Sequence, residues 1–252
     1  MSAPPNIVIS VQNLMIGYPG QVVLEHINFE VRRGEVFAIL GKTGSGKSTL
    51  LKSLIGLYPP LAGEVLIEGT NIGTVEGDER LRLLRRIGVL YQSGALFGSM
   101  SVLENVRLPL DAFTRLPEMA KDLVALAKLK LVDLKESAAK GPDELSGGMK
   151  RRAALARAIV ADPAILFLDE PSAGLDPITS AALDALFKEL SRDAGITLVI
   201  VTHELPSIFA IADRVILLDA DTKSIVAEGN PHELRDHATE PLVRHFFRRE
   251  AM

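Results

Sequence analysis

A glycine-rich stretch carries the residues with the clearest chemistry in this sequence, Gly41-Lys42-Thr43-Gly44-Ser45-Gly46-Lys47-Ser48-Thr49. Its spacing fits G-x-x-x-x-G-K-[ST], the pattern of a phosphate-binding loop. The apolar run Val36 to Leu40 precedes it, and a leucine-rich run with helical spacing follows, so the required strand and helix are both indicated. This stretch therefore predicts a nucleoside triphosphate site.

The residue types of this loop suit the binding of phosphate. Gly44 and Gly46 can adopt backbone angles closed to other residues, so that successive N–H groups converge on phosphate oxygens at a helix N-terminus. Lys47 would reach the β- and γ-phosphates, and Ser48 would place its hydroxyl on Mg²⁺. The alternative is a turn that only joins a strand to a helix, and the complete motif in its context disfavours it.

Two carboxylates follow another apolar run. Residues 164–168 form a continuous apolar run typical of a central parallel strand, and Asp169 and Glu170 come directly after it. Asp169 would hold Mg²⁺, usually through water, whereas Glu170 would orient or deprotonate the water that attacks the γ-phosphate. The pair therefore predicts hydrolysis as well as binding.

Polar residues also end two other predicted strands. Gln92 follows the run Ile87 to Tyr91, and such strand ends are where ligands meet parallel sheets. It is a candidate ligand of Mg²⁺ or water, and the alternative is a solvated strand cap. His203 lies near the end of the run Thr197 to Val201, where it would either hydrogen-bond a γ-phosphate oxygen or have a structural role.

A glycine pair introduces a helical run later in the chain. Ser146 is a good N-cap, and Gly147 and Gly148 allow close approach to the helix N-terminus. Three cations occupy the first turns of this helix, Lys150, Arg151 and Arg152. They oppose the helix dipole unless an anion lies in front of it. A phosphate there and simple screening of exposed cations are both compatible with the pattern.

The remaining patterns indicate the elements that position these groups. Residues 7–11 and 22–31 alternate and predict an antiparallel β layer, and Tyr18 between them would either stack on a purine or cover the sheet edge. Strand patterns are absent from residue 93 to residue 161, where helical periodicity replaces them. We expect an α/β fold and a single domain. Its P-loop NTPase core, with a mixed or parallel sheet, spans 1–92 and 162–252, and 93–161 form an inserted helical subdomain.

Composition narrows the function classes. A net charge of −4 gives no basic field for nucleic acid, and the absence of cysteine excludes disulfides and thiolate chemistry. The apolar runs are far shorter than the roughly 20 residues of a membrane helix. The first residues lack the features of a signal peptide, so we expect a cytoplasmic chain.

Taken in order, these motifs resemble the nucleotide-binding subunits of ATP-binding cassette (ABC) transporters across nearly the whole chain. The resemblance implies ATP and Mg²⁺ as ligands, with Tyr18 on the adenine, Gln92 touching both Mg²⁺ and the membrane partner, and His203 supporting the γ-phosphate. It also implies a head-to-tail homodimer in which Ser146 and Gly148 of one copy complete the ATP site of the other. Met149 departs from the family, most of which has Gln at this position.

Two stretches are similar to one branch of the family, the ATPase subunits of Mla-type phospholipid systems of Gram-negative envelopes. These are Leu90 to Phe97 and Leu145 to Met149, in which Met149 becomes a trait of the branch. The resemblance implies integral membrane permease subunits and a lipid-binding domain protein as partners, no nucleic acid, and a location on the cytoplasmic face of the inner membrane. Residues 95–97 would meet the permease, or alternatively pack into the subdomain's own core.

Other functions are compatible with parts of the pattern. The same ATPase could serve another ABC system that imports a solute or extracts lipoprotein. A non-transport ABC ATPase acting on nucleic acid or ribosomes usually has two cassettes or a long coiled-coil insertion, and neither pattern is visible here. A catalytically silent binding module is disfavoured because Lys47, Asp169 and Glu170 are all present.

Overall fold

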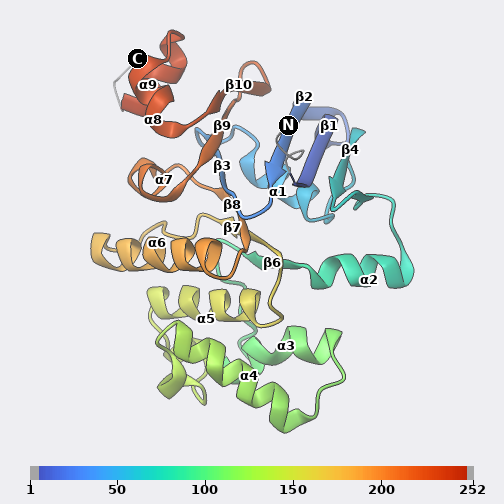
Figure 1. Ribbon diagram of the computed structural model, residues 1–252, viewed down its shortest axis with the longest axis vertical. Coiled ribbons are helices and arrows are strands. Elements are labelled where there is room, and N and C mark those ends of the chain that lie inside the picture. The colour runs from blue at the N-terminus through green and yellow to red at the C-terminus, as the bar shows by residue number, and fades with distance from the viewer. Residues whose placement is uncertain (1–5, 249–252) are drawn as a thin grey trace.

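The computed structural model describes residues 6–248, which form two sheets and a separate group of helices (Figure 1). The first sheet is antiparallel and has the strand order β2-β1-β4-β5. Its strands are β1 (Ile7–Tyr18), β2 (Gln21–Arg32), β4 (Ala62–Ile67) and β5 (Thr70–Asn71). The predicted antiparallel layer is confirmed, but β1 continues beyond Val11. Its pairing with β2 shifts register between Val11 and Leu14, where Asn13 has φ 46°, and this bulge interrupts the alternation.

The second sheet is mixed and has the order β10-β9-β3-β8-β7-β6. Its strands are β3 (Val36–Gly41), β6 (Ile87–Leu90), β7 (Ile165–Asp169), β8 (Thr197–Val201), β9 (Arg214–Asp219) and β10 (Ser224–Gly229). All of these pairings are parallel except that of β9 with β10. Every residue of β3, β7 and β8 is buried, as their continuous apolar runs predict. The carboxyl ends of β3, β8, β7 and β6 therefore meet at one edge.

Among the residues that the structure describes, six helices lie between or after the strands of the two sheets in the sequence, outside the segment between β6 and β7. They are α1 (Lys47–Leu54), α2 (Gly77–Arg85), α6 (Pro177–Arg192), α7 (Leu205–Ile211), α8 (Pro231–His237) and α9 (Pro241–Arg248). Asp176 caps α6 through the backbone N–H groups of Ile178 and Thr179, and Pro177 takes the first helical position. The helical pattern at the end of the sequence predicts a helix from Pro241 to Arg249; α9 follows this pattern to Arg248, and Arg249 lies outside the described residues. Within residues 6–248, no helix is long and apolar enough to cross a membrane.

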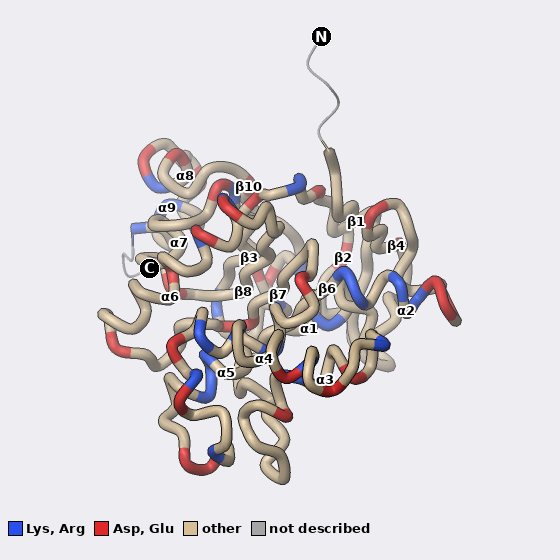
Figure 2. The backbone as a smooth tube through the Cα atoms, turned by 60° about the horizontal axis from the view of Figure 1, so that its bottom comes forward, with Lys and Arg blue, Asp and Glu red and all other residues tan. Residues whose placement is uncertain are grey.

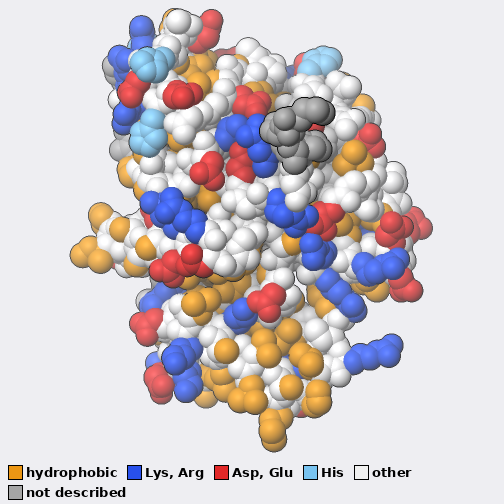
Figure 3. Space-filling model, in the orientation of Figure 1, with side chains coloured by type: hydrophobic (Ala, Val, Ile, Leu, Met, Phe, Trp, Pro, Cys, Tyr) orange, Lys and Arg blue, Asp and Glu red, His pale blue; other side chains and the backbone are white. Residues whose placement is uncertain are grey.

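The helices between β6 and β7 gather at the end of the molecule away from the antiparallel sheet (Figure 1). They are α3 (Val102–Phe113), α4 (Glu118–Leu131) and α5 (Gly147–Ile159). Hydrophobic side chains are exposed over this end (Figure 3), where Met119 is 77% and Leu123 62% exposed. The helical insertion that the sequence predicts is therefore present as a helical layer.

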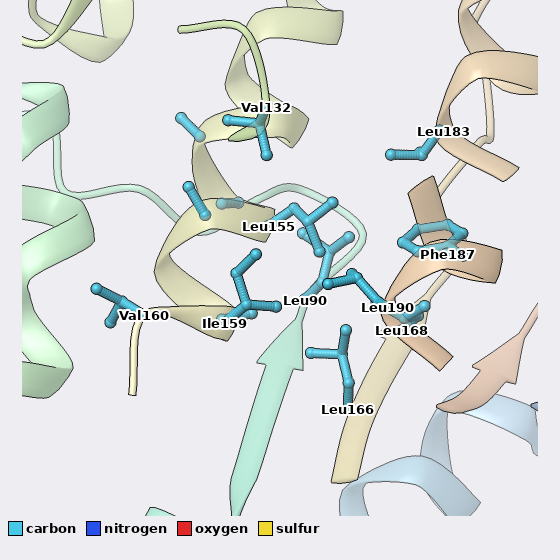
Figure 4. Packing of buried hydrophobic residues seen from close by; sticks show 14 of the residues in the cluster. Leu90, Val132, Leu155, Ile159, Val160, Leu166, Leu168, Leu183, Phe187 and Leu190 are labelled. Carbon is cyan, nitrogen blue, oxygen red and sulfur yellow. The ribbon is translucent and has the colours of Figure 1, made fainter. Parts of the chain in front are cut away.

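A buried cluster joins these helices to the parallel sheet (Figure 4). Leu155 and Ile159 of α5 lie beside Leu90 at the end of β6, and Phe187 of α6 belongs to the same cluster. Each fully buried side chain of this size contributes roughly 1.5–3 kcal/mol to folding. This packing fixes α5 over the edge of the sheet where the candidate site residues lie.

Candidate nucleotide site

The glycine-rich loop joins β3 to α1 and leaves the start of that helix without a side-chain cap. Gly46 is the N-cap with φ 91°, and Gly44 has φ 85°, both in the left-handed region that favours glycine. A Cβ on Gly46 would lie 2.9 Å from Leu24 Cγ of β2, so the loop also packs too closely for a larger residue. The backbone N–H groups at this helix start are therefore suited to receive an anion.

Lys47 lies at the centre of the loop and is buried. Its Nζ donates to the carbonyl oxygens of Gly41 at 2.7 Å and Lys42 at 3.0 Å. Burial lowers the pKa of Lys47, whereas the charges of Glu170 and Asp169 raise it. The ammonium group therefore lies within electrostatic reach of both carboxylates. A phosphate beside it would offset the cost of burying its charge.

Asp169 is the last residue of β7 and carries a buried oxygen without a partner. Its side-chain Oδ1 accepts no hydrogen bond, although the residue is only 8% exposed. Burial raises the pKa of Asp169, and the charge of Glu170 raises it further. A divalent cation would satisfy this oxygen and favour its charged form. The structure therefore fits a metal ion at this position.

The remaining metal ligands cannot all be acidic side chains. In the described part of the chain, no three residues of the types His, Cys, Asp and Glu form a group that could hold a metal ion. Ser48, which is exposed on the first turn of α1, and the exposed Gln92 carry neutral oxygens and are the other ligands that the sequence predicts. This donor set suits Mg²⁺, which commonly binds through one or two carboxylates together with water and substrate phosphates.

Glu170 directly follows β7 and is held from two sides by residues that follow β8. Thr202 Oγ1 donates to its Oε2 at 3.0 Å, and Nδ1 of His203 lies 2.8 Å from its Oε1. The backbone of Glu170 has φ 48°, and its N–H donates to the carbonyl of Val201 at 2.8 Å. A left-handed conformation in a non-glycine residue stores strain, which is common where a side chain must be aimed at a ligand.

The role of Thr202 was not predicted from the sequence. The available signal was its position, because it directly precedes His203 at the end of a buried strand that neighbours β7. His203 is predicted to support a γ-phosphate, and in this structure it contacts Glu170 while its side chain remains 59% exposed. The two residues together fix the direction of the Glu170 carboxylate.

Gln92 lies in a turn rather than directly at a strand end. The strand β6 ends at Leu90, one residue earlier than predicted, because the N–H of Gly94 closes a turn onto the carbonyl of Tyr91 at 2.8 Å. Gln92 is exposed and lines a hollow of about 320 Å³ together with Gly147 and Gly148. The structure thus places Gln92 near the start of α5.

The start of α5 is open, as its sequence predicts. Ser146 is the N-cap, and its Oγ accepts a hydrogen bond from the N–H of Met149 at 3.3 Å. A Cβ on Gly147 would meet nothing within 4 Å, so this face of the helix is free in one copy of the chain. The cations Lys150, Arg151 and Arg152 follow along α5. Elsewhere along the backbone, basic and acidic residues are interspersed (Figure 2).

Tyr18 lies beside the phosphate loop at the β1–β2 turn. Its hydroxyl is 3.5 Å from Thr49 Oγ1 of α1, and its ring meets that of Tyr58 edge to face, with centroids 6.2 Å apart. The residue is 44% exposed, which leaves ring surface for a further contact. Its predicted stacking on adenine remains a prediction.

A separate groove of about 390 Å³ lies between α6 and the facing ends of α4 and α5. Its walls include Leu175, Leu183 and Arg151, and neither the phosphate loop nor the carboxylates line it. The phosphate loop and the two carboxylates therefore lie outside this groove, whereas Gly148 at the start of α5 is one of its lining residues.

The glycine-rich loop between β3 and α1 and the carboxylates that follow β7 form a P-loop site, and comparison with known proteins identifies the family. Residues 24–173 match the family model described as ABC transporter. The chain belongs to this family and is an ATP-hydrolysing subunit of an ABC transporter.

Individual relatives refine this result. The intermembrane phospholipid transport system ATP-binding protein MlaF of Haemophilus influenzae is 40% identical over 226 residues, which cover 90% of this chain and 85% of MlaF. The methionine import ATP-binding protein MetN of Carboxydothermus hydrogenoformans is 38% identical over 241 residues, 94% of this chain and 71% of MetN. A dimeric ATP-binding cassette solved in a post-hydrolysis state with ADP and Pi has 31% identity and a TM-score of 0.81, over 88% of this chain and 98% of that one.

The comparisons confirm the predicted family, the fold class and the ATPase activity. They also support ATP or ADP as the nucleotide and a dimeric cassette with transporter partners. The identities to MlaF and MetN differ by two percentage points, 40% against 38%, so identity alone does not decide what is transported.

Proposed function

We propose that this subunit powers the movement of phospholipid across or between the membranes of a Gram-negative envelope. The observation that carries the proposal is the 40% identity to MlaF across 90% of the chain, taken together with two short stretches of the sequence. The loop Leu90 to Phe97 and the unusual Met149 support it, because both resemble the phospholipid branch. The proposed partners are integral membrane permease subunits and a lipid-binding domain protein, with this chain on the cytoplasmic face of the inner membrane and no role for nucleic acid.

In this proposal, the loop from Gly41 to Thr49 holds the phosphates of ATP while Tyr18 stacks on the adenine. Lys47 moves its hydrogen bonds from loop carbonyls to phosphate oxygens, so that its buried ammonium group donates to negatively charged oxygens instead of neutral ones. Ser48, Gln92 and Asp169 would hold Mg²⁺. When bound, this ion neutralises charge on the phosphates.

Glu170 acts as the base or orienting group for the attacking water. The hydroxyl of Thr202 and the ring of His203 hold its carboxylate in one direction, so little reorganisation is needed when water is polarised. His203 also supports the γ-phosphate through its exposed side. Lys47 and Gln92 complete the set of proposed catalytic residues.

A second copy completes each site in a head-to-tail dimer. Ser146, Gly147 and Gly148 present the open start of α5, whose N–H groups would face the γ-phosphate bound by the partner. ATP binding closes the dimer, and hydrolysis resets it. We assign the movement to a helical subdomain, 93–161, relative to a core formed by 1–92 and 162–252 within one ABC domain.

Phe97 is the proposed contact with the permease. Its side chain is 55% exposed, whereas the neighbouring Leu96 packs partly against the helical core. The backbone of Phe97 is fixed by Asn105, which accepts from its N–H at 2.7 Å and donates to its carbonyl at 3.0 Å. The exposure disfavours the alternative in which Phe97 fills the subdomain's own core.

Purification of the intact complex tests the proposal. The tagged chain is extracted from membranes in mild detergent, and its partners are placed in lipid nanodiscs. The proposal predicts that an integral membrane protein accompanies the chain, and that ATPase activity responds to the phospholipid content of the nanodisc but not to methionine. Stimulation by methionine, with no response to phospholipid, would assign the chain to solute import instead.

A further inference from the structure

Arg157 of α5 is a half-buried cation whose hydrogen bonds go to a loop rather than to an acid. Its Nη2 donates to the carbonyl of Gly94 and its Nη1 to the carbonyl of Ala95, each at 2.7 Å. Among residues 6–248, the salt bridges do not include Arg157. Burial lowers the pKa of Arg157, with only the charge of Tyr91 opposing it. The partial burial of this charge is therefore offset by hydrogen bonds to two backbone carbonyls and not by an acidic partner.

These two carbonyls form the exit of the turn that holds Gln92. The N–H of Gly94 bonds to the carbonyl of Tyr91, so Gln92 and Ser93 are the central residues of the turn. Gly94 has φ 73° and Ala95 has φ 46°, and a left-handed alanine persists only where surrounding contacts enforce it. The fork of the Arg157 guanidinium supplies that contact.

The entrance of the same turn is fixed by the sheet. Leu90 ends β6 opposite Leu168 of β7, the residue before Asp169. Burial raises the pKa of Tyr91, Arg157 opposes this shift, and the charge of Asp169 adds to it, so the turn begins within electrostatic reach of that carboxylate. On one side of Gln92, the chain is therefore held by the pairing of β6 with β7 next to Asp169. On the other side, Gly94 and Ala95 are held by Arg157 of α5.

The helix that carries Arg157 also packs directly against the end of β6 and the turn that follows it. Leu155 and Ile159, on the same helix, pack beside Leu90 (Figure 4), and a Cβ on Gly94 would lie 3.5 Å from Ala154 Cβ. The start of α5, with Ser146 and its glycines, is ten residues away on the same rigid element. A shift of α5 would therefore carry the exit of the turn with it.

We propose that Arg157 is a positioning residue that couples α5 to Gln92, so that the start of α5 and the Gln92 side chain move together when nucleotide binds. The inference rests on the proposed role of Gln92 in the site. It adds a residue that acts on the turn through two backbone carbonyls.

A double-mutant cycle on the full-length chain in its membrane complex tests this coupling. The variants are Arg157→Ala, Gln92→Ala and the double substitution, measured as kcat and KM for ATP and as melting temperature. We expect Arg157→Ala to lower kcat roughly tenfold or more while KM changes less than about twofold. The double variant should be no slower than Gln92→Ala alone, because the two residues act in one pathway.

Two further variants separate positioning from stability. Arg157→Lys keeps the charge but reaches one carbonyl at a time, so its kcat should lie between those of the wild type and Arg157→Ala. Arg107→Ala removes another arginine of the helical layer, which pairs with Asp111, Glu118 and Asp122, and it should lower the melting temperature without lowering kcat.

Each outcome decides the proposal. Additive losses in the cycle, or a normal kcat in Arg157→Ala with a slow Gln92→Ala, would overturn the role of Arg157 and leave the proposed function standing. Equal rate losses in Arg157→Ala and Arg107→Ala that follow melting temperature would reduce Arg157 to a stability role. A Gln92→Ala variant that turns over like the wild type would remove both the proposed role of Gln92 and the inference built on it.

Discussion

Gly148→Asp separates the folding of one copy from the assembly of the proposed composite site. A Cβ at this position would lie 3.5 Å from Leu175 Cδ2 and 3.9 Å from Thr179 Cγ2, which are ordinary contacts. Gly148 is in the first turn of α5, where a carboxylate gains about 0.3–1 kcal/mol from the helix dipole. Replacing a helical glycine removes a further cost of up to about 1 kcal/mol. The variant monomer should therefore melt at or above the wild-type temperature.

The same substitution should weaken closure of the ATP-bound dimer. If the start of α5 faces the γ-phosphate of the partner, a carboxylate about 4 Å from that charge adds about 4 kcal/mol of repulsion at an effective dielectric constant of 20. This energy corresponds to roughly a thousandfold loss in the closing equilibrium, since about 1.4 kcal/mol is tenfold.

The assay is ATP-dependent dimerisation, measured by light scattering in a Glu170→Gln background, with Gly148→Ala as the matched control. The alanine variant adds the same Cβ without the charge and should keep most closure. Normal dimerisation of the aspartate variant would mean that α5 does not face a phosphate, and the composite site would be wrong.

Further substitutions test other parts of the site. Glu170→Gln should bind ATP with near-normal affinity and lose nearly all turnover, because the amide keeps the shape but not the charge; near-normal phosphate release would exclude Glu170 as the base. Asp169→Asn tests linkage to pH: the raised pKa means that the folded chain binds more protons than the unfolded chain above the ordinary value of 3.8, so wild-type stability falls as pH rises through that window. The melting temperature of the nucleotide-free Asn variant should therefore rise relative to that of the wild type as the pH increases above 3.8, and a difference that is the same at every pH would contradict this. Phe97→Ala should leave melting temperature nearly unchanged, because the side chain is 55% exposed, while transfer per ATP falls; lost stability with normal transfer would return Phe97 to the core.

Local patterns were sufficient to predict that the glycine-rich loop joins a strand to a helix and that both carboxylates lie at the end of a strand. Each lies at the end of a strand whose residues are all buried, so the strand appears in the sequence as a continuous apolar run. The cap of α5 was also predictable, because Ser146 and the N–H that it binds are three residues apart. The chemistry of these groups follows from residues that are close in sequence.

The contacts that aim these groups could not be predicted in the same way. Thr202 and Glu170 are 32 residues apart, and Arg157 is 62 and 63 residues from the carbonyls that it binds, so only the folded topology brings them together. The short helices α7 and α8 have seven residues each, too few for a clear period. The extension of β1 was hidden by the bulge near Asn13.

Reconstituted phospholipid transfer is the most direct test of the central claim. The complex containing this chain is placed between donor vesicles with labelled phospholipid and unlabelled acceptors, and transfer is followed together with phosphate release. Phospholipid transfer should require ATP and should stop in Glu170→Gln while the complex stays assembled. The same complex should show no ATP-dependent uptake of methionine. Robust ATP hydrolysis without ATP-dependent movement of phospholipid would contradict the central claim.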